Sequence, residues 1–230
     1  MTFPCVRFRV FVILALLFSI GPESRAQDIF IGFKGGVVLN NDMQEVSRGG
    51  SESKRGEFGP VVEFKWPSGF AAEASFLYRR VGYDSAAWGI PADVTYRIRA
   101  NSWEVPVTAK YYLAASNRNA QAFVLSGYVL RALSGAAVKS QTLSYPGYEL
   151  ITNRGAANLK NSVNPGPTFG GGVQFGSGRI RFSPEFRYTR WLLVPFNEEG
   201  SKGYRVHSAA NQVNFRMSLS FAARRATKLR

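Results

Sequence analysis

The sequence holds one cysteine and one histidine among 230 residues, and both scarcities exclude much of enzyme chemistry. Cys5 lies in the N-terminal segment, so the rest of the chain has no disulfide, no cysteine metal cluster and no thiol nucleophile. His207 alone cannot build a multi-histidine metal site and supplies at most one imidazole base. We therefore expect no catalytic residues, no metal site and no cofactor.

The chain also lacks an apolar run of the roughly 20 residues that a membrane-spanning helix needs. The apolar stretch 10–20 is shorter, follows two arginines and precedes small residues at Ser24 and Ala26. This order is typical of a secretory signal peptide, which we predict over residues 1–26, with cleavage before Gln27. The exported protein is then either soluble or crosses a membrane as strands.

Acidic residues are few. The 15 Asp and Glu face 29 Lys and Arg, which gives a formal net charge of +14. A basic excess favours anionic partners such as nucleic acid, phospholipid or lipopolysaccharide. Here most cations stand singly between apolar residues, and the dense cluster is the tail 222–230. We therefore expect no nucleic-acid binding and interpret the tail as a solvated basic end, with contact to anionic lipid headgroups as the alternative.

What the sequence has instead is alternation. In residues 212–221, apolar side chains occupy the odd positions and polar ones the even positions, which predicts a strand with one apolar and one polar face. Similar alternation, weaker in the fifth and sixth segments, marks eight segments: 28–39, 57–66, 70–79, 103–112, 121–133, 168–175, 179–191 and 212–221.

The connections between these segments alternate strictly between long and short: 40–56, 67–69, 81–101, 113–120, 134–167, 176–178 and 192–211. In an antiparallel array this places all short turns at one end and all long loops at the other, as in outer-membrane barrels. We predict an all-β fold, an eight-stranded antiparallel up-and-down transmembrane β-barrel over residues 27–221. A soluble periplasmic barrel that carries an apolar ligand shows the same period with its faces reversed, and remains an alternative.

In the membrane interpretation the apolar face meets lipid, and aromatic rings form girdles at the two headgroup zones. The expected lipid-facing or girdle residues are Phe64, Trp66, Phe76, Tyr78, Trp103, Tyr111, Phe186, Tyr188, Trp191, Phe215, Met217 and Phe221.

The polar faces then fill the lumen, which in an eight-stranded barrel is wide enough only for side chains. The expected lumen residues are Lys34, Glu63, Lys65, Glu73, Arg79, Glu104, Lys110, Arg131, Arg181, Glu185, Arg187 and Arg216. Pairing across the turn 67–69 places Glu63 opposite Glu73 and Glu57 opposite Arg79. Two facing carboxylates could form a glycosidase-like acid/base pair, but we favour a salt-bridge network, since a filled lumen admits no substrate.

Four stretches resemble a known family: residues 59–83, SWEVPVTAKYY (102–112), SPEFRYTRW (183–191) and NQVNFRMSLSF (211–221). They are similar to the small outer-membrane β-barrel proteins grouped with the OmpA-type transmembrane domain, and the resemblance covers about residues 27–221. It implies residence in the outer membrane of a diderm bacterium, among lipids that include lipopolysaccharide, without implying one activity. Such barrels usually end on the aromatic residue that the barrel-assembly machinery reads, whereas residues 222–230 follow Phe221 here.

His207 and Ser208 resemble the histidine and serine of lipid A deacylase barrels. Adjacent strand residues point to opposite faces, however, whereas a general base must reach the proton of its nucleophile. The sequence therefore predicts a non-enzymatic anchor that displays extracellular loops for surface interaction or envelope integrity, with a lipid-modifying barrel enzyme as the alternative. The loop 134–167, the longest, is the expected contact for an unknown extracellular partner.

Overall fold

The computed structural model describes residues 28–41, 43–45, 51–52, 54–87, 92–113, 120–144, 149–156, 161–176, 179–193, 195 and 206–224. Within these ranges all regular structure is β-strand, and no helix there has the length and apolar character needed to cross a membrane. The predicted signal peptide, 1–26, lies outside the described residues, as does the end of the basic tail.

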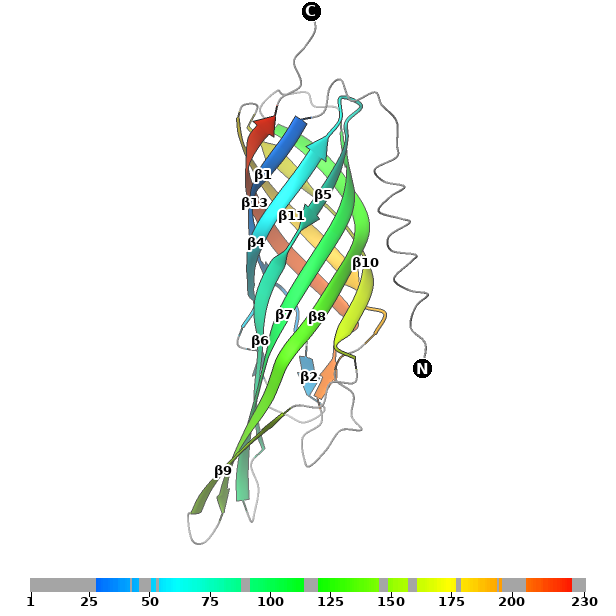
Figure 1. Cartoon of the computed structure of the whole chain (residues 1–230). Coiled ribbons are helices and arrows are strands. Elements are labelled where there is room, and N and C mark those ends of the chain that lie inside the picture. Colours follow the sequence, from blue (N-terminus) through cyan, green and yellow to red (C-terminus); the bar gives the residue numbers. More distant parts are fainter. Residues whose placement is uncertain are drawn as a thin grey trace, which may run out of the picture.

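The strands close into a barrel with eight antiparallel wall strands, which confirms the predicted fold (Figure 1). Each wall strand is called a stave here, because one of them is formed by two strands, β5 and β6. Each stave pairs with the next along the chain, and the last pairs with the first. In chain order the staves are β1 (Asp28–Val38), β4 (Gly56–Lys65), β5 (Phe70–Ser75) with β6 (Leu77–Ala87), β7 (Ala92–Tyr112), β8 (Ala120–Ser144), β10 (Val163–Phe175), β11 (Ile180–Arg190) and β13 (Asn211–Arg224).

The third stave is divided at Phe76, between β5 and β6. The pairing with β4 keeps one register across the division, from Val61 opposite Ser75 to Phe58 opposite Tyr78. Phe76 donates its backbone N–H to the carbonyl of Pro60 at 3.0 Å. Because Pro60 has no N–H to return, one hydrogen bond of the ladder is missing there. The division is therefore a local gap in one continuous stave.

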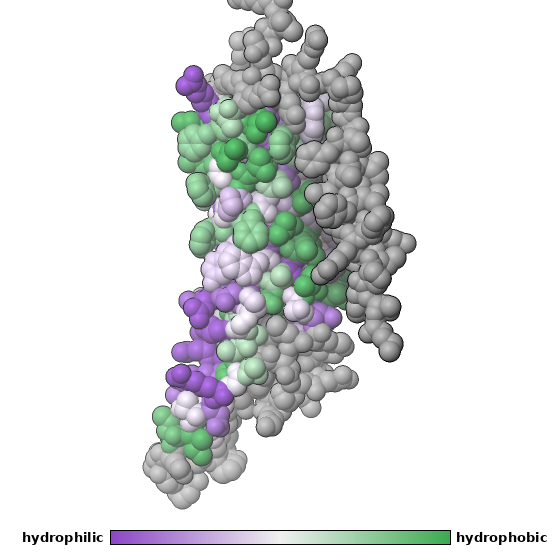
Figure 2. Space-filling model, in the orientation of Figure 1, coloured by the Kyte–Doolittle hydropathy of each residue, from purple (hydrophilic) through white to green (hydrophobic). Residues whose placement is uncertain are grey.

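The faces of the staves follow the predicted alternation. In β11, Phe182 and Phe186 are exposed, whereas Ser183, Glu185 and Arg187 between and beyond them are buried. Apolar side chains therefore point outward and polar ones point into the barrel, which is the reverse of a soluble barrel. Figure 2 shows, on the face in view, apolar side chains gathered over the barrel wall.

The short turn between β4 and β5 lies at the end where β1 begins and β13 ends (Figure 1). The turn from Trp66 to Phe70 is closed by two backbone hydrogen bonds, and Gly69 within it has a φ of 86°. A left-handed residue at this position favours glycine because glycine has no Cβ.

At the opposite end, the residues 81–101 and 134–167 differ from the expected loops. β6, β7 and β8 continue beyond the barrel as one sheet, and β9 (Glu149–Ala156) pairs with the far part of β8. A bulge between Arg99 and Asn101 bends this sheet near Gly135, whose φ is 59°. Figure 1 shows the sheet, here called the projecting sheet, standing away from the barrel rim. Alternation continues in this sheet, since residues 97–101 are in turn exposed or half-buried and buried.

Two small pairings complete the loop end. β3 (Ser51–Glu52) pairs with β6, and β2 (Met43–Glu45) pairs with β12 (Val206–Ser208) in a separate two-stranded sheet.

Candidate functional site in the barrel lumen

Ten of the twelve expected lumen residues are buried and two are half-buried. The half-buried ones are Lys65 and Arg181. The buried ones are Lys34, Glu63, Glu73, Arg79, Glu104, Lys110, Arg131, Glu185, Arg187 and Arg216. They come from every stave except β10, and alternation places them there because each lies on the inward parity of its strand.

Glu73 on β5 is the centre of a first cluster. One of its carboxylate oxygens lies 2.5 Å from Nζ of Lys34 and 2.6 Å from a guanidinium nitrogen of Arg187. The other oxygen lies 2.6 Å from Nζ of Lys110. In the order of the eight staves, β5 and β11 are four apart, so Glu73 and Arg187 join opposite walls of the barrel. Side chains therefore close the lumen at this level.

Glu185 and Glu63 balance the cations around Glu73. Glu185 lies 2.9 Å from Lys34 and 2.7 Å from Arg187. Glu63 accepts hydrogen bonds at 2.9 Å from both Lys110 and the hydroxyl of Tyr112. Buried charges persist in this way when opposite charges and hydrogen bonds surround them.

Glu63 and Glu73 stand opposite each other in the β4–β5 register, as the sequence predicts. Lys110 bridges them, at 2.9 Å from Glu63 and 2.6 Å from Glu73. Their geometry is therefore that of a salt-bridge network, in which neither carboxylate is without a cationic partner.

A second cluster lies nearer the projecting sheet. Arg216 on β13 contacts Glu57 at 2.5 Å and Glu104 at 2.9 Å, and Asn214 donates to Glu57 at 3.1 Å. β13 and β7 are again four staves apart, so Glu104 and Arg216 form a second connection between opposite walls. Glu57 also stands opposite Arg79 in the strand register, as predicted.

Trp191 corrects the expected girdle. It is 3% exposed and lies inside the barrel, where its indole N–H donates to Gln212 at 2.8 Å. The guanidinium carbon of Arg131 lies 4.0 Å from the centre of its ring, a cation–π arrangement. The sequence pattern of β11 could have predicted this inward position, because Trp191 is separated by an even number of positions from the inward-facing Glu185 and Arg187.

The other expected lipid-facing or girdle residues lie on the outer face. Seven are exposed and four are half-buried against neighbours. The exposed ones are Trp66, Phe76, Trp103, Tyr111, Phe186, Met217 and Phe221. The half-buried ones are Phe64, Tyr78, Phe215 and Tyr188. Ring pairs run between adjacent staves, for example Tyr78 with Trp103 at 4.7 Å and Phe186 with Phe215 at 4.9 Å between centroids.

The sequence analysis did not predict that aromatic side chains also point into the lumen and contact its cations. Arg181 lies 3.4 Å from the ring centre of Phe30, Lys65 lies 3.3 Å from that of Tyr112, and Lys110 lies 4.6 Å from that of Phe123. These rings share the inward parity of their strands, which is the signal that could have found them. The lumen is therefore charged in its middle and lined by aromatic faces toward the short turns.

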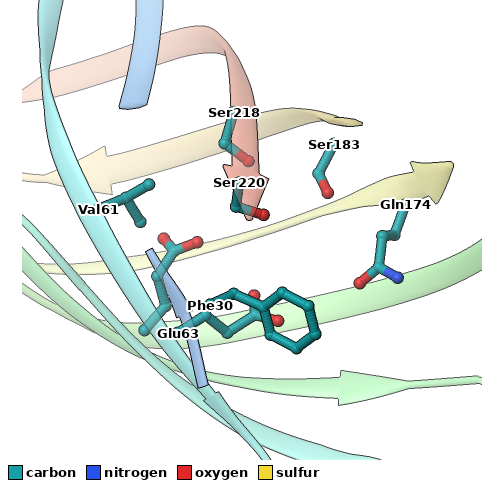
Figure 3. Close-up of a pocket in the computed structure, with 8 residues that line it drawn as sticks. Phe30, Val61, Glu63, Gln174, Ser183, Ser218 and Ser220 are labelled. Atoms are coloured by element: carbon teal, nitrogen blue, oxygen red, sulfur yellow. The ribbon is translucent and has the colours of Figure 1, made fainter. Parts of the chain in front are cut away.

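Figure 3 shows a small pocket in the short-turn half of the lumen. Its walls combine the hydroxyls of three serines with two carboxylates: the lining residues are Phe30, Val61, Glu63, Glu73, Gln174, Ser183, Ser218 and Ser220. The described residues include no group of three or more His, Cys, Asp or Glu that could hold a metal ion. Since both carboxylates already contact Lys110, the pocket is a polar part of the lumen network.

His207 lies in β12, where its backbone pairs with Gln44 of β2 at the loop end. The side chain of His207 lies outside what the structure describes. Ser208 pairs with Met43 and is half-buried. That His207 and Ser208 form no catalytic pair thus stays a prediction, with the lipid-modifying enzyme as the alternative.

A closed ring of eight staves with an apolar exterior and a charged interior defines an outer-membrane β-barrel. The family model described as "Outer membrane protein beta-barrel domain" matches residues 24–192, and the chain belongs to this family, which places it in the outer membrane. No curated protein matches the sequence.

The chain is also similar to solved structures of outer-membrane proteins. OprG from Pseudomonas aeruginosa is 12% identical with a TM-score of 0.53, covering 85% of this chain and 95% of its own. The attachment invasion locus protein Ail of Yersinia pestis is 14% identical with a TM-score of 0.38, covering 85% and 96%. Neisserial surface protein A is 10% identical with a TM-score of 0.35, covering 85% and 97%.

Proposed function

We propose that the protein is a non-enzymatic outer-membrane anchor whose closed barrel holds the projecting sheet outside the cell, for surface interaction or envelope integrity. The contact between Glu73 and Arg187 carries this proposal, because it joins opposite walls of the lumen at 2.6 Å. A lumen closed by ion pairs suits a rigid support better than a diffusion channel or a substrate cavity. The partners we propose are outer-membrane lipids, the barrel-assembly machinery and an extracellular partner of the projecting sheet.

Protease shaving of intact cells, combined with fractionation, tests this function. We expect the protein in the detergent-extracted envelope with heat-modifiable gel mobility. We also expect cleavage confined to the connections at the loop end, which include residues 40–56 and 192–211. Release of the protein into the osmotic-shock fraction, or cleavage at the short turns 67–69 and 176–178, contradicts the proposed placement.

The enzymatic alternative depends on His207 and Ser208. We expect cells that carry the wild type and cells that carry His207→Ala with Ser208→Ala to have the same lipid A, measured by mass spectrometry. A lipid A species present only with the wild type supports the enzyme instead.

A further inference from the structure

Five cations share the outer face of the projecting sheet, beyond the barrel rim. This basic face consists of Arg80, Arg97, Arg99, Lys139 and Arg154. Three of them form one row across three strands, since Arg97 stands opposite Lys139 and Lys139 stands opposite Arg154. Neighbouring strands lie about 4.8 Å apart, so the row holds its charges at close and regular spacing. Figure 2 shows the hydrophilic surface of this sheet directly beyond the apolar band.

The negative charge on this face is smaller than the positive charge. Among the side chains that the structure describes there, Asp84 is the one carboxylate, and it receives hydrogen bonds from Arg97 at 2.9 Å and from Arg99 at 3.0 Å. Partial burial raises the pKa of Asp84, but the hydrogen bonds from Arg99 and Arg97 outweigh burial and hold the pKa below its ordinary value. Asp84 is thus ionised at neutral pH and offsets one of five positive charges.

Lys139 and Arg154 make no ion pair with any described carboxylate. Arg154 is exposed and Lys139 is half-buried. Holding like charges side by side in a sheet is unfavourable unless an anion lies between them. The basic face therefore has the charge of an anion-binding surface, since its one described carboxylate, Asp84, pairs with Arg97 and Arg99 only.

The position of the basic face relative to the membrane surface indicates which anion it contacts. Arg80 follows the girdle residue Tyr78 by two positions on the same face, about 7 Å along the strand. Arg97 precedes Trp103 by six positions on β7, about 20 Å along the strand. The face thus begins at the headgroup level and continues outward. The opposite face of the same sheet is apolar and buried at Val81, Tyr83 and Ile98, so the outer face is the one that meets surrounding molecules.

We propose that the basic face binds the phosphate groups on the sugars of lipopolysaccharide in the surrounding outer leaflet. This inference rests on the proposed placement of the projecting sheet outside the cell. Multiple phosphates at and just above the headgroup level match cations arranged from Arg80 to the row of Arg97, Lys139 and Arg154. Guanidinium groups suit this role because they donate two hydrogen bonds to one phosphate.

The test uses the full chain in phosphatidylcholine nanodiscs, titrated with deacylated, phosphorylated lipopolysaccharide saccharide. The variant K139Q/R154Q removes two cations that have no described ion pair, and R179Q/R190Q removes two exposed cations at the two ends of β11. Each basic residue near an anionic lipid surface contributes a factor of about five in affinity. We expect the Kd of K139Q/R154Q to rise about 25-fold, with that of R179Q/R190Q unchanged and with K139R/R154K retaining most of the affinity.

Phosphatase treatment of the saccharide should abolish binding to the wild type, and about 0.5 M salt should weaken it strongly, since that salt screens exposed charges within a few ångströms. Equal affinity for treated and untreated saccharide, or an unchanged Kd for K139Q/R154Q, overturns the proposal. Binding of soluble heparin without binding of the phosphorylated saccharide overturns it too, because the partner is then a free polyanion. Heat-modifiable mobility in the same samples reports the barrel separately, so a failed insertion is distinguished from a failed basic face.

Discussion

Glu73 contacts three lumen cations, Lys34, Lys110 and Arg187, at 2.5 to 2.6 Å. Replacing it by glutamine leaves Lys34, Lys110 and Arg187 around a neutral amide in a buried site. Removing one partner of a buried ion pair costs about 3–5 kcal/mol. Here three buried cations would be left with two carboxylates, Glu63 and Glu185. We expect Glu73→Gln to lower the free energy of unfolding by about that amount, measured by urea denaturation in lipid vesicles.

Asp84→Asn is the matched control for Glu73. It also removes a carboxylate that pairs with two cations, but at a partly exposed site. Exposed ion pairs contribute about 0–1 kcal/mol. If both variants cost the same, the lumen network does not stabilise the barrel in the way that its burial indicates.

Trp191 and Trp103 allow the two faces of the barrel to be compared directly. We expect brominated phospholipids to quench the fluorescence of a variant that keeps only Trp103 and to leave a variant that keeps only Trp191 largely unquenched. The physical reason is that Trp103 is 36% exposed on the outer wall, whereas Trp191 is 3% exposed inside it. Replacing the other three tryptophans by phenylalanine makes each variant, and strong quenching of Trp191 contradicts its inward position.

At the level of elements, Gly59 on β4 lies where the neighbouring backbone leaves no room for a side chain. A Cβ on Gly59 would lie 1.8 Å from the carbonyl oxygen of Phe76, which is backbone and cannot rotate away. We expect Gly59→Ala to destabilise the barrel by about 1–3 kcal/mol through overpacking, or to prevent assembly. The measurement is the fraction of heat-modifiable protein after refolding into vesicles.

Gly155 on β9 provides the comparison, since a Cβ there meets nothing within 4 Å. Gly155→Ala should refold like the wild type. Equal refolding of Gly59→Ala and wild type would show that β4 and β6 separate more easily than their contact suggests.

Alternation with a period of two made the staves predictable from sequence, because membrane and lumen impose opposite polarity on successive residues. The order of residues alone is enough to place Glu63 opposite Glu73 and Lys34 inside the barrel. It did not separate strand from loop in residues 81–101, where the polarity of the two faces is the reverse of that in the barrel wall: Arg97 lies on the outer face and Ile98 on the inner face. Arg216 contacts both Glu57 and Glu104, which lie on other strands of the barrel. Such contacts depend on how the barrel closes and on side-chain rotamers, and the alternation of polar and apolar residues within one strand specifies neither.

For the whole molecule, closure of the lumen has an electrical consequence. Two connections cross between opposite walls, Glu73 to Arg187 and Glu104 to Arg216. We expect the purified protein in planar bilayers to show none of the large stepwise conductance of a water-filled porin. Recording at neutral pH in about 1 M KCl tests this, with a general porin as positive control, and steady porin-sized steps contradict a closed lumen.

The pairing of β1 with β13 determines when the barrel can close relative to the synthesis and export of the chain. Phe33 meets Leu219 and Lys34 meets Ser218, so the earliest and latest strands are hydrogen-bonded neighbours. The seam between them cannot form until nearly every residue has been synthesised and exported, and contacts so distant in sequence form slowly. Until then β1 and β13 each have an unpaired edge and the apolar outer face has no bilayer to meet, so we expect this polypeptide to travel to its bilayer shielded and unfolded.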